Sequence, residues 1–203
     1  MLALPTSFLP SVHYLARIKA EGKAVVIYVG EPYRKRSFRS RTALMTANGV
    51  CHFSIPIKSH SFPVPPSSEI EISEHGKWRH RLMETLRSGY GSAPFWEIYC
   101  DELEDLVFDN STHMLVEYNQ RWLEMLCRVW SLTAPPIVDQ LQEGTPFEAE
   151  LLDDSYLESL PAPRYWQVFE QEMGFVKHLS ALDLLLHLGP EGVLYLRRIA
   201  LDA

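Results

Sequence analysis

The order of apolar and polar residues near the N-terminus predicts a strand, a helix and a second strand. A short apolar run at residues 2–4 enters a proline-rich turn, and residues 12–20 have helical character that ends at Gly22. Residues 24–29 form a continuous apolar, β-branched run, which is typical of a strand buried on both faces of a parallel sheet. A beginning of this kind favours an α/β fold.

A hairpin and one further strand are predicted next. Two apolar segments between residues 42 and 57 flank Asn48 and Gly49, a pair that readily supplies the positive φ angles of a tight hairpin turn. The proline-rich residues 59–68 are typical of a loop, and residues 69–72 alternate as in a strand. Together with the strands above, these segments predict a mixed sheet.

Three helices are predicted between residues 77 and 130. The first breaks at residues 89–94, and Ser111 or Thr112 can cap the third, which reaches Trp130. The second is expected to bury one apolar stripe, formed by Phe95, Ile98, Tyr99, Leu103 and Leu106.

The remaining part of the chain begins with an acidic segment. Residues 140–158 hold six carboxylates and no basic residue, a pattern typical of a surface loop. Tyr165, Gln167 and Phe169 alternate as on a strand, and two helices separated by Gly189 are expected to follow.

These elements predict one α/β domain over residues 1–203. Its N-terminal sheet is mixed or parallel and carries helices, an α-helical block follows, and a strand-plus-helices segment ends the chain. We divide it into an α/β part at about 1–75, a helical part at about 76–131, the acidic excursion at about 132–160 and a C-terminal part at 161–203.

Composition narrows the classes of function. Nineteen basic against 26 acidic residues give a net charge of −7, which argues against a protein whose whole surface binds nucleic acid or an anionic membrane but leaves room for a local basic patch. No apolar run is long enough to cross a bilayer and no secretory signal is recognisable, so we expect a cytoplasmic protein. The three cysteines contain no Cys-x-x-Cys pair, which disfavours a disulfide framework or a zinc knuckle.

The densest charge cluster lies directly after the buried strand at residues 24–29. Arginine side chains bind phosphate oxygens in a bidentate manner, and open α/β sheets bind ligands outside the carboxyl ends of their strands. The alternative is a solvated loop that pairs with the acidic residues 140–158. The cluster consists of Arg34, Lys35, Arg36, Arg39 and Arg41, interleaved with Tyr33 and Phe38.

Other candidate residues are scattered along the chain. His13 follows the proline-rich turn, where Ser11 can cap a helix, and it is either an acid–base group or a packed polar residue. No glycine-rich dinucleotide motif or P-loop is present, and no pair of histidines has metal-ligand spacing. Tyr165 could stack on a sugar and Gln167 is a polar candidate, with core packing as the alternative for both.

Several blocks along the chain, in a fixed order, carry a family resemblance. They are residues 9–15, 33–41, 47–58, Trp78, 88–95, 99–103, 165–169, 174–175 and 179–185. These blocks resemble the WbqC-like family. The resemblance implies a transferase that modifies an activated amino sugar in the synthesis of bacterial surface polysaccharides such as O-antigen. Where the family often has a His-Trp-Arg sequence this chain has Leu82, which puts a family histidine in doubt and leaves His80 as a substitute; His178 also stands where the family has Asn.

The leading hypothesis is therefore a transferase that holds a phosphate-bearing donor such as a nucleotide sugar. The alternative is a non-catalytic binding or assembly protein of the same pathway. His13 or His80 would handle a proton, no metal ligand is assigned, and the sequence names no cofactor or oligomeric state. The expected ligand-binding residues are Tyr14, Tyr33, Lys35, Arg36, Arg39, Arg41, Asn48, Lys58, Tyr165 and Gln167.

Overall fold

The structure is a computed structural model that describes residues 1–60 and 62–202. Its N-terminal sheet is parallel, with strands β1 (Leu2–Pro5), β2 (Val25–Tyr28) and β5 (Ile137–Val138) in the order β1-β2-β5. Helix α1 (Val12–Glu21), followed by the 3-10 turn η1 (Gly22–Ala24), connects the first two strands and confirms the predicted strand–helix–strand beginning. The short β5, directly after two prolines, was not predicted because two residues carry no periodic pattern.

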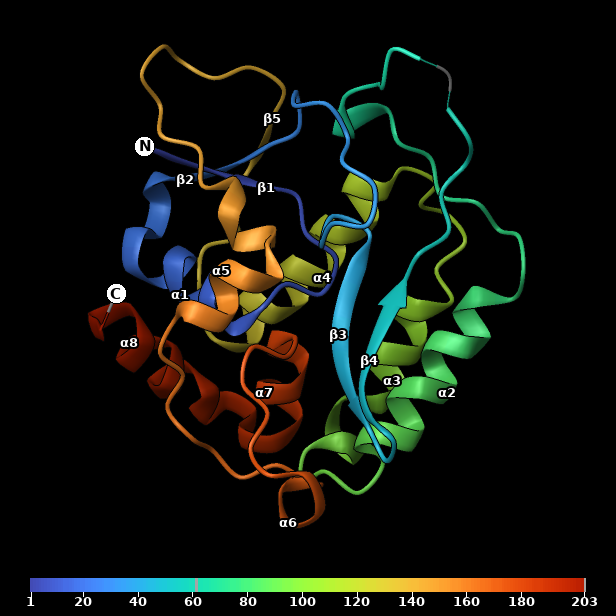
Figure 1. The fold of residues 1–203 in the computed structure, drawn as a ribbon, viewed down its shortest axis with the longest axis vertical. Helices are drawn as coiled ribbons and strands as arrows, with labels where there is room; N and C mark the ends of the chain where they lie inside the picture. The colour runs from blue at the N-terminus through green and yellow to red at the C-terminus, as the bar shows by residue number, and fades with distance from the viewer. Residues whose placement is uncertain (61, 203) are drawn as a thin grey trace.

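The predicted hairpin is confirmed as a separate two-stranded sheet. Strands β3 (Arg41–Thr46) and β4 (Gly49–Ser54) pair antiparallel and stand beside the helical block in Figure 1. Residues 69–72 form only isolated bridges, and the 3-10 turn η2 (Ser67–Glu69) replaces the start of the predicted strand. Residues 70–73 bond alternately to residues 56–58 and 113–115, so they form no continuous ladder with one partner. The sheet expected to be mixed is therefore two sheets, one parallel and one antiparallel.

The helical block consists of α2 (Trp78–Tyr90), α3 (Trp96–Val107) and α4 (Leu115–Val129). Gly89 lets α2 approach β3, since a Cβ at this position would collide with the carbonyl oxygen of Met45. Two details of the sequence prediction were wrong: Ile98 is 65% exposed, and neither Ser111 nor Thr112 caps α4. The buried face of α3 is formed by Trp96, Tyr99, Leu103 and Val107.

The last part of the chain is helical. It contains η3 (Ala149–Leu152), α5 (Asp154–Ser159), α6 (Glu170–Met173), α7 (Ala181–Leu188), η4 (Gly189–Glu191) and α8 (Gly192–Asp202), and α8 packs along α1 (Figure 1). The strand predicted at residues 165–169 does not form, because the Gln167 side chain bonds both backbone groups of Val176 in place of a neighbouring strand.

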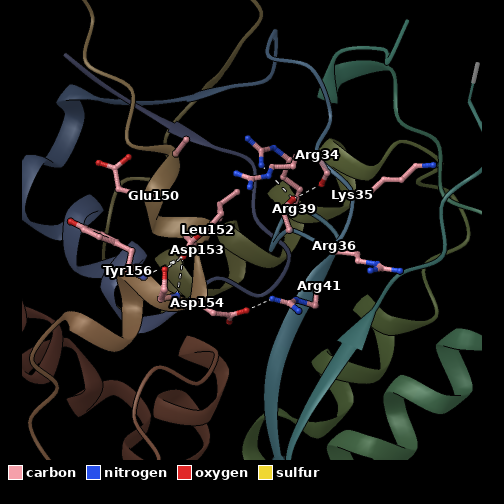
Figure 2. A pocket seen from close by; sticks show the side chains of 13 residues that line it. Arg34, Lys35, Arg36, Arg39, Arg41, Glu150, Leu152, Asp153, Asp154 and Tyr156 are labelled. Atoms are coloured by element: carbon pink, nitrogen blue, oxygen red, sulfur yellow. Dashed lines mark hydrogen bonds and ion pairs between the residues drawn. The ribbon is translucent and has the colours of Figure 1, made fainter. Parts of the chain in front are cut away.

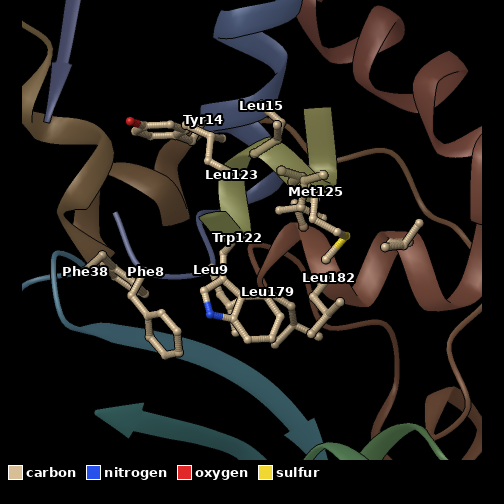
Figure 3. Packing of buried hydrophobic residues seen from close by; sticks show 14 of the residues in the cluster. Phe8, Leu9, Tyr14, Leu15, Phe38, Trp122, Leu123, Met125, Leu179 and Leu182 are labelled. Atoms are coloured by element: carbon tan, nitrogen blue, oxygen red, sulfur yellow. The ribbon is translucent and has the colours of Figure 1, made fainter. Parts of the chain in front are cut away.

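The buried core joins these parts. In Figure 3, Trp122 of α4 lies against Leu9 from the first turn and Leu179 and Leu182 around the start of α7. All four side chains are fully or almost fully buried. Among the helices of residues 1–60 and 62–202, none is both long and apolar enough to cross a membrane.

Candidate functional site

The basic loop, residues 33–41, follows the carboxyl end of β2 and is anchored by its most buried arginine, Arg39. Arg39 donates from Nε to Oε1 of Glu31 at 2.8 Å, and the side chains of this pair are only 6% and 11% exposed. Ser67 donates to the same carboxylate oxygen, while Asn119 donates to the carbonyl oxygen of Arg39 at 2.8 Å. The Arg39 guanidinium, which was expected to hold a ligand, is therefore engaged in holding the loop.

A tight turn presents the next three cations to solvent. Ser37 donates to the carbonyl oxygen of Arg34 at 2.6 Å, and Arg36 has a left-handed backbone with φ of 59°. Tyr33 beneath the turn lies 2.6 Å from the Ser40 hydroxyl, and burial raises the pKa of Tyr33. The side chains of Arg34, Lys35 and Arg36 are exposed, and within the described residues none of them forms an ion pair.

Part of the acidic excursion, residues 149–156, lies across an open cleft from the basic loop. Asp153 caps α5 by accepting from the backbone N–H groups of Ser155 and Tyr156 at 2.9 and 3.3 Å. A hydrogen bond from the Ser155 hydroxyl, together with these two backbone bonds, lowers the pKa of Asp153. Asp154 forms an ion pair with Arg41 across the gap. The Arg41 guanidinium also lies 4.9 Å from the centre of the Phe38 ring.

Between the basic loop and residues 149–156 lies an open cleft of about 600 Å³, which we call the arginine cleft (Figure 2). Five cationic side chains and three carboxylates line it, so the cleft has a positive surplus. In Figure 2 Arg41 points across the cleft at Asp154, whereas Lys35 and Arg36 point away from the carboxylates. The structure thus combines both expectations for the basic loop: it borders a recess, and part of it pairs with the acidic segment. The charged lining residues are Arg34, Lys35, Arg36, Arg39, Arg41, Glu150, Asp153 and Asp154.

His13 and Tyr14 lie on the first turn of α1, which Ser11 caps as expected. His13 Nε2 is 2.8 Å from the carbonyl oxygen of Pro161, and burial lowers the pKa of His13. Its ring borders a hollow of about 220 Å³ that shares Tyr156 with the arginine cleft. Tyr14 is 1% exposed and donates to the carbonyl oxygen of Pro5 at 2.7 Å, which positions it as a packing residue.

Of the expected site residues, only Lys35, Arg36, Arg39 and Arg41 line the cleft, and His80, Asn48 and Lys58 lie well apart from it. The His80 ring packs against Phe108 at 4.9 Å on α2, and Asn48 occupies the exposed hairpin turn. Lys58 is exposed and forms an ion pair with Glu71 beside the proline-rich loop. None of the three lines the arginine cleft, and no histidine among the described residues does.

Comparison with known proteins supports the resemblance seen in the sequence. The model of the WbqC-like protein family matches residues 6–142, which is more than half of the chain. The chain belongs to the WbqC-like protein family. No curated protein and no solved structure matches it.

The matched region of this WbqC-like chain contains the basic loop but not the acidic wall. Residues 149–156, which line the opposite side of the cleft, follow the end of the match at residue 142. His178, a second histidine close to His13, also lies beyond it.

Tyr165 and Gln167 converge on Asp183, a carboxylate in the first turn of α7. Asp183 is fully buried; it accepts from the Tyr165 hydroxyl and from Gln167 Nε2, the latter at 3.0 Å. Burial, followed by the charge of Asp183, raises the pKa of Tyr165. An aspartate inside the otherwise apolar run 181–186 was the available signal for this cluster.

His187 completes the cluster as a neutral imidazole. Its Nε2 accepts from the backbone N–H of Val168 at 3.0 Å, so Nδ1 carries the hydrogen and donates to the carbonyl oxygen of Asp183 at 2.7 Å. Burial acts to lower the pKa of His187, but its bonds to Asp183 outweigh burial and raise it. The cluster fastens residues 165–168 to α7, which favours packing over sugar stacking for Tyr165.

No metal centre emerges from the described residues. Within residues 1–60 and 62–202, no three or more His, Cys, Asp or Glu side chains are grouped to hold a metal ion. Cys127 is buried, and burial raises the pKa of its thiol to about 12, so this thiol is protonated at neutral pH.

Proposed function

We propose that this protein is a transferase of bacterial surface-polysaccharide or nucleotide-sugar modification, and that the arginine cleft holds the phosphate-bearing donor. The observation that carries the proposal is an open recess lined by exposed Arg34, Lys35 and Arg36 outside the carboxyl end of a parallel strand. Open α/β sheets bind ligands at this edge. Membership of the WbqC-like family supports the same class of pathway.

The Arg41–Asp154 ion pair does not prevent a phosphate from binding. Asp154 is 53% exposed, and an exposed ion pair contributes about 0.2–1 kcal/mol. A charge-assisted hydrogen bond to a phosphate oxygen contributes about 1.5–3 kcal/mol, and a guanidinium can make two. A donor phosphate can therefore displace Asp154 from Arg41.

The acidic wall limits the kind of anion that fits. Glu150, Asp153 and Asp154 line the same cleft and would repel a long polyanion. A mono- or diphosphate joined to an uncharged or cationic group meets the cations at one end only. This distribution favours a nucleotide sugar or amino-sugar phosphate over a nucleic-acid backbone.

The proposal is tested by calorimetric titration with a panel of nucleotide sugars and with inorganic pyrophosphate. We expect saturable binding that the double substitution Arg34→Ala and Arg36→Ala weakens about tenfold or more. The matched control removes two cations from α2 by Arg81→Ala and Arg87→Ala and should leave affinity within about twofold. Equal losses in both double variants, or no binding of any panel member, would refute a phosphate site in the cleft.

The alternative is a non-catalytic binding or assembly protein of the same pathway. It is favoured by the cleft lining itself, which among the described residues includes no histidine to transfer a proton. The two functions differ in turnover: an assembly protein would bind the donor and return it unchanged, whereas a transferase would consume it with an acceptor.

A further inference from the structure

A second histidine lies directly beside His13. The rings of His13 and His178 are 5.0 Å apart between centroids and tilted by 45°. They come from segments distant in sequence, and a bridge between Ser11 and Ser180 holds those segments together. His178 has a left-handed backbone, with φ of 65°, which is uncommon for a residue other than glycine.

The two imidazoles are buried but poorly satisfied. His13 is 4% and His178 is 8% exposed. His13 Nδ1 and both ring nitrogens of His178 are buried without a protein partner, so only the bond from His13 Nε2 to Pro161 is made. Buried polar atoms are normally paired, and three unpaired nitrogens at one place indicate a site for a further hydrogen-bonding group.

The surroundings keep both rings neutral, and the lowered pKa values make the imidazoles weak bases until the site opens to water. Burial, the neighbouring His13 and the charge of Lys177 lower the pKa of His178 to about 4, and burial also lowers the pKa of His13. A neutral imidazole has a nitrogen lone pair that can accept a proton. Other charged or titratable groups facing the pair across its two hollows are Arg17, His52, Glu148, Asp154, Tyr156 and Glu158.

Helix α5 separates this pair from the arginine cleft. His13 borders the 220 Å³ hollow and His178 a second hollow of about 370 Å³. Tyr156 is shared by the cleft and the first hollow, and Asp154 by the cleft and the second, so α5 is their common partition. In Figure 1, α5 lies between α1 and β3.

Few contacts hold α5 in this position. They include the Arg41–Asp154 ion pair, a bond from Lys177 Nζ to the carbonyl oxygen of Glu158 at 3.0 Å, and the buried Leu157. The ion pair is the contact that a phosphate in the cleft would break. Loss of an exposed ion pair releases a six-residue helix more readily than it disturbs the core.

We propose that His13 and His178 form one concealed proton-accepting site, which joins the arginine cleft when α5 moves and receives the hydroxyl or amine of an acceptor. The inference rests on the proposed function for its donor. In the transfer, the acceptor's O–H or N–H bond breaks and its proton passes to an imidazole nitrogen. The acceptor atom bonds to the transferred carbon of the donor, and the phosphate oxygen leaves with the bonding electron pair and is held by the arginines.

Access to the pair is tested with diethyl pyrocarbonate, which modifies neutral imidazoles, on the full-length chain. We expect His178 to react about tenfold or more slowly than exposed His75, and Asp154→Asn to accelerate His178 about fivefold or more without any anion. The control Asp139→Asn removes an exposed carboxylate before the cleft wall and should leave the rate unchanged. A His178 rate in Asp154→Asn equal to the unaltered chain overturns the gating.

Inorganic pyrophosphate separates this inference from the proposed function. Pyrophosphate should accelerate modification of His178 in the unaltered chain but not in the Arg34→Ala, Arg36→Ala double variant. Failure of pyrophosphate to bind counts against the proposed function alone, because the Asp154→Asn comparison contains no anion. Binding in the cleft with His178 still protected overturns the link between cleft and pair.

Coupling within the pair is tested by following the imidazole signals of His178 by NMR against pH. Its pKa should rise above about 4 in His13→Asn, which removes the neighbouring imidazole, and move toward about 6.5 in Asp154→Asn, where water enters. A purely structural His178 would keep its pKa near 4 in Asp154→Asn, and that result overturns the proposal.

Discussion

At the scale of single residues, the five cations of the basic loop have different tasks. Arg39 is buried against Glu31, and Arg41 is paired with Asp154. The other three cations of the loop, Arg34, Lys35 and Arg36, are exposed and form no ion pair with the described residues. The sequence predicted a basic cluster beside a strand end but could not separate these tasks. The roles of Arg39 and Arg41 depend on their acidic partners Glu31 and Asp154, which lie 8 and 113 residues away in the sequence. Both ion pairs form only in the folded chain.

Substitution of Arg39 should therefore reduce stability more than it changes surface charge. Arg39→Ala leaves the Glu31 carboxylate, only 11% exposed, without its cation, and we expect a loss of about 3–5 kcal/mol in the free energy of unfolding. The exposed Arg36→Ala should stay within about 0.5 kcal/mol. Urea denaturation followed by circular dichroism gives both values, and similar stabilities for the two variants would contradict the anchoring role.

Tyr165 offers a second test at this scale. Tyr165→Phe keeps the ring but removes the hydroxyl that donates to the buried Asp183, so unfolding should become easier by about 1–3 kcal/mol. Tyr156→Phe is the matched control, because that side chain is 38% exposed. Equal denaturation midpoints would mean that the Asp183 cluster does not hold the 165–168 segment.

At the scale of elements, periodicity located the helices better than their ends and faces. The first strand, α1, β2 and the hairpin matched their patterns because buried apolar runs and an Asn-Gly turn are local signals. The acidic excursion did not behave as a solvated loop. Its carboxylates reach solvent and the cleft, but Leu151, Leu152 and Leu157 are buried, and Phe147 bridges Ala3 beside the parallel sheet. These contacts depend on partners more than a hundred residues away.

The burial of His13 and His178 should make stability depend on pH. The pKa values of both histidines in the folded chain lie below the ordinary 6.5, so the unfolded chain binds protons at a higher pH than the folded chain does. Their contribution to the free energy of unfolding is therefore complete above about pH 6.5 and declines toward pH 4. Asn cannot titrate, so His178→Asn should show a smaller loss of unfolding free energy between pH 7 and pH 4.5. His187, whose pKa is raised, acts in the opposite direction in both proteins and cancels in the comparison. Identical pH profiles from denaturation at a series of pH values would refute this role for His178.

At the scale of the whole molecule, the family match ends before the elements that complete the core. Residues 6–142 contain the hairpin and the strands β2 and β5, yet α7 and α8 beyond them contribute Leu182, Leu186 and Leu196, each with no exposed area. The sequence predicted these helices from their apolar spacing. It could not predict that α8 would pack along α1, because that pairing joins the two ends of the chain.

A chain shortened to residues 1–142 should therefore fail to fold. Removing α7 and α8 exposes the apolar faces of α1 and α4, and loss of even one buried leucine contact typically costs about 2–5 kcal/mol, against a total stability of about 5–15 kcal/mol. We expect a collapsed NMR spectrum and low solubility for this fragment. A flexible insertion at Gly144, where an added Cβ meets nothing within 4 Å, interrupts the same region but keeps every core element and should preserve a dispersed spectrum. A well-dispersed spectrum from the shortened chain would show that residues 1–142 fold alone. The C-terminal helices would then pack against the site without being required for the fold.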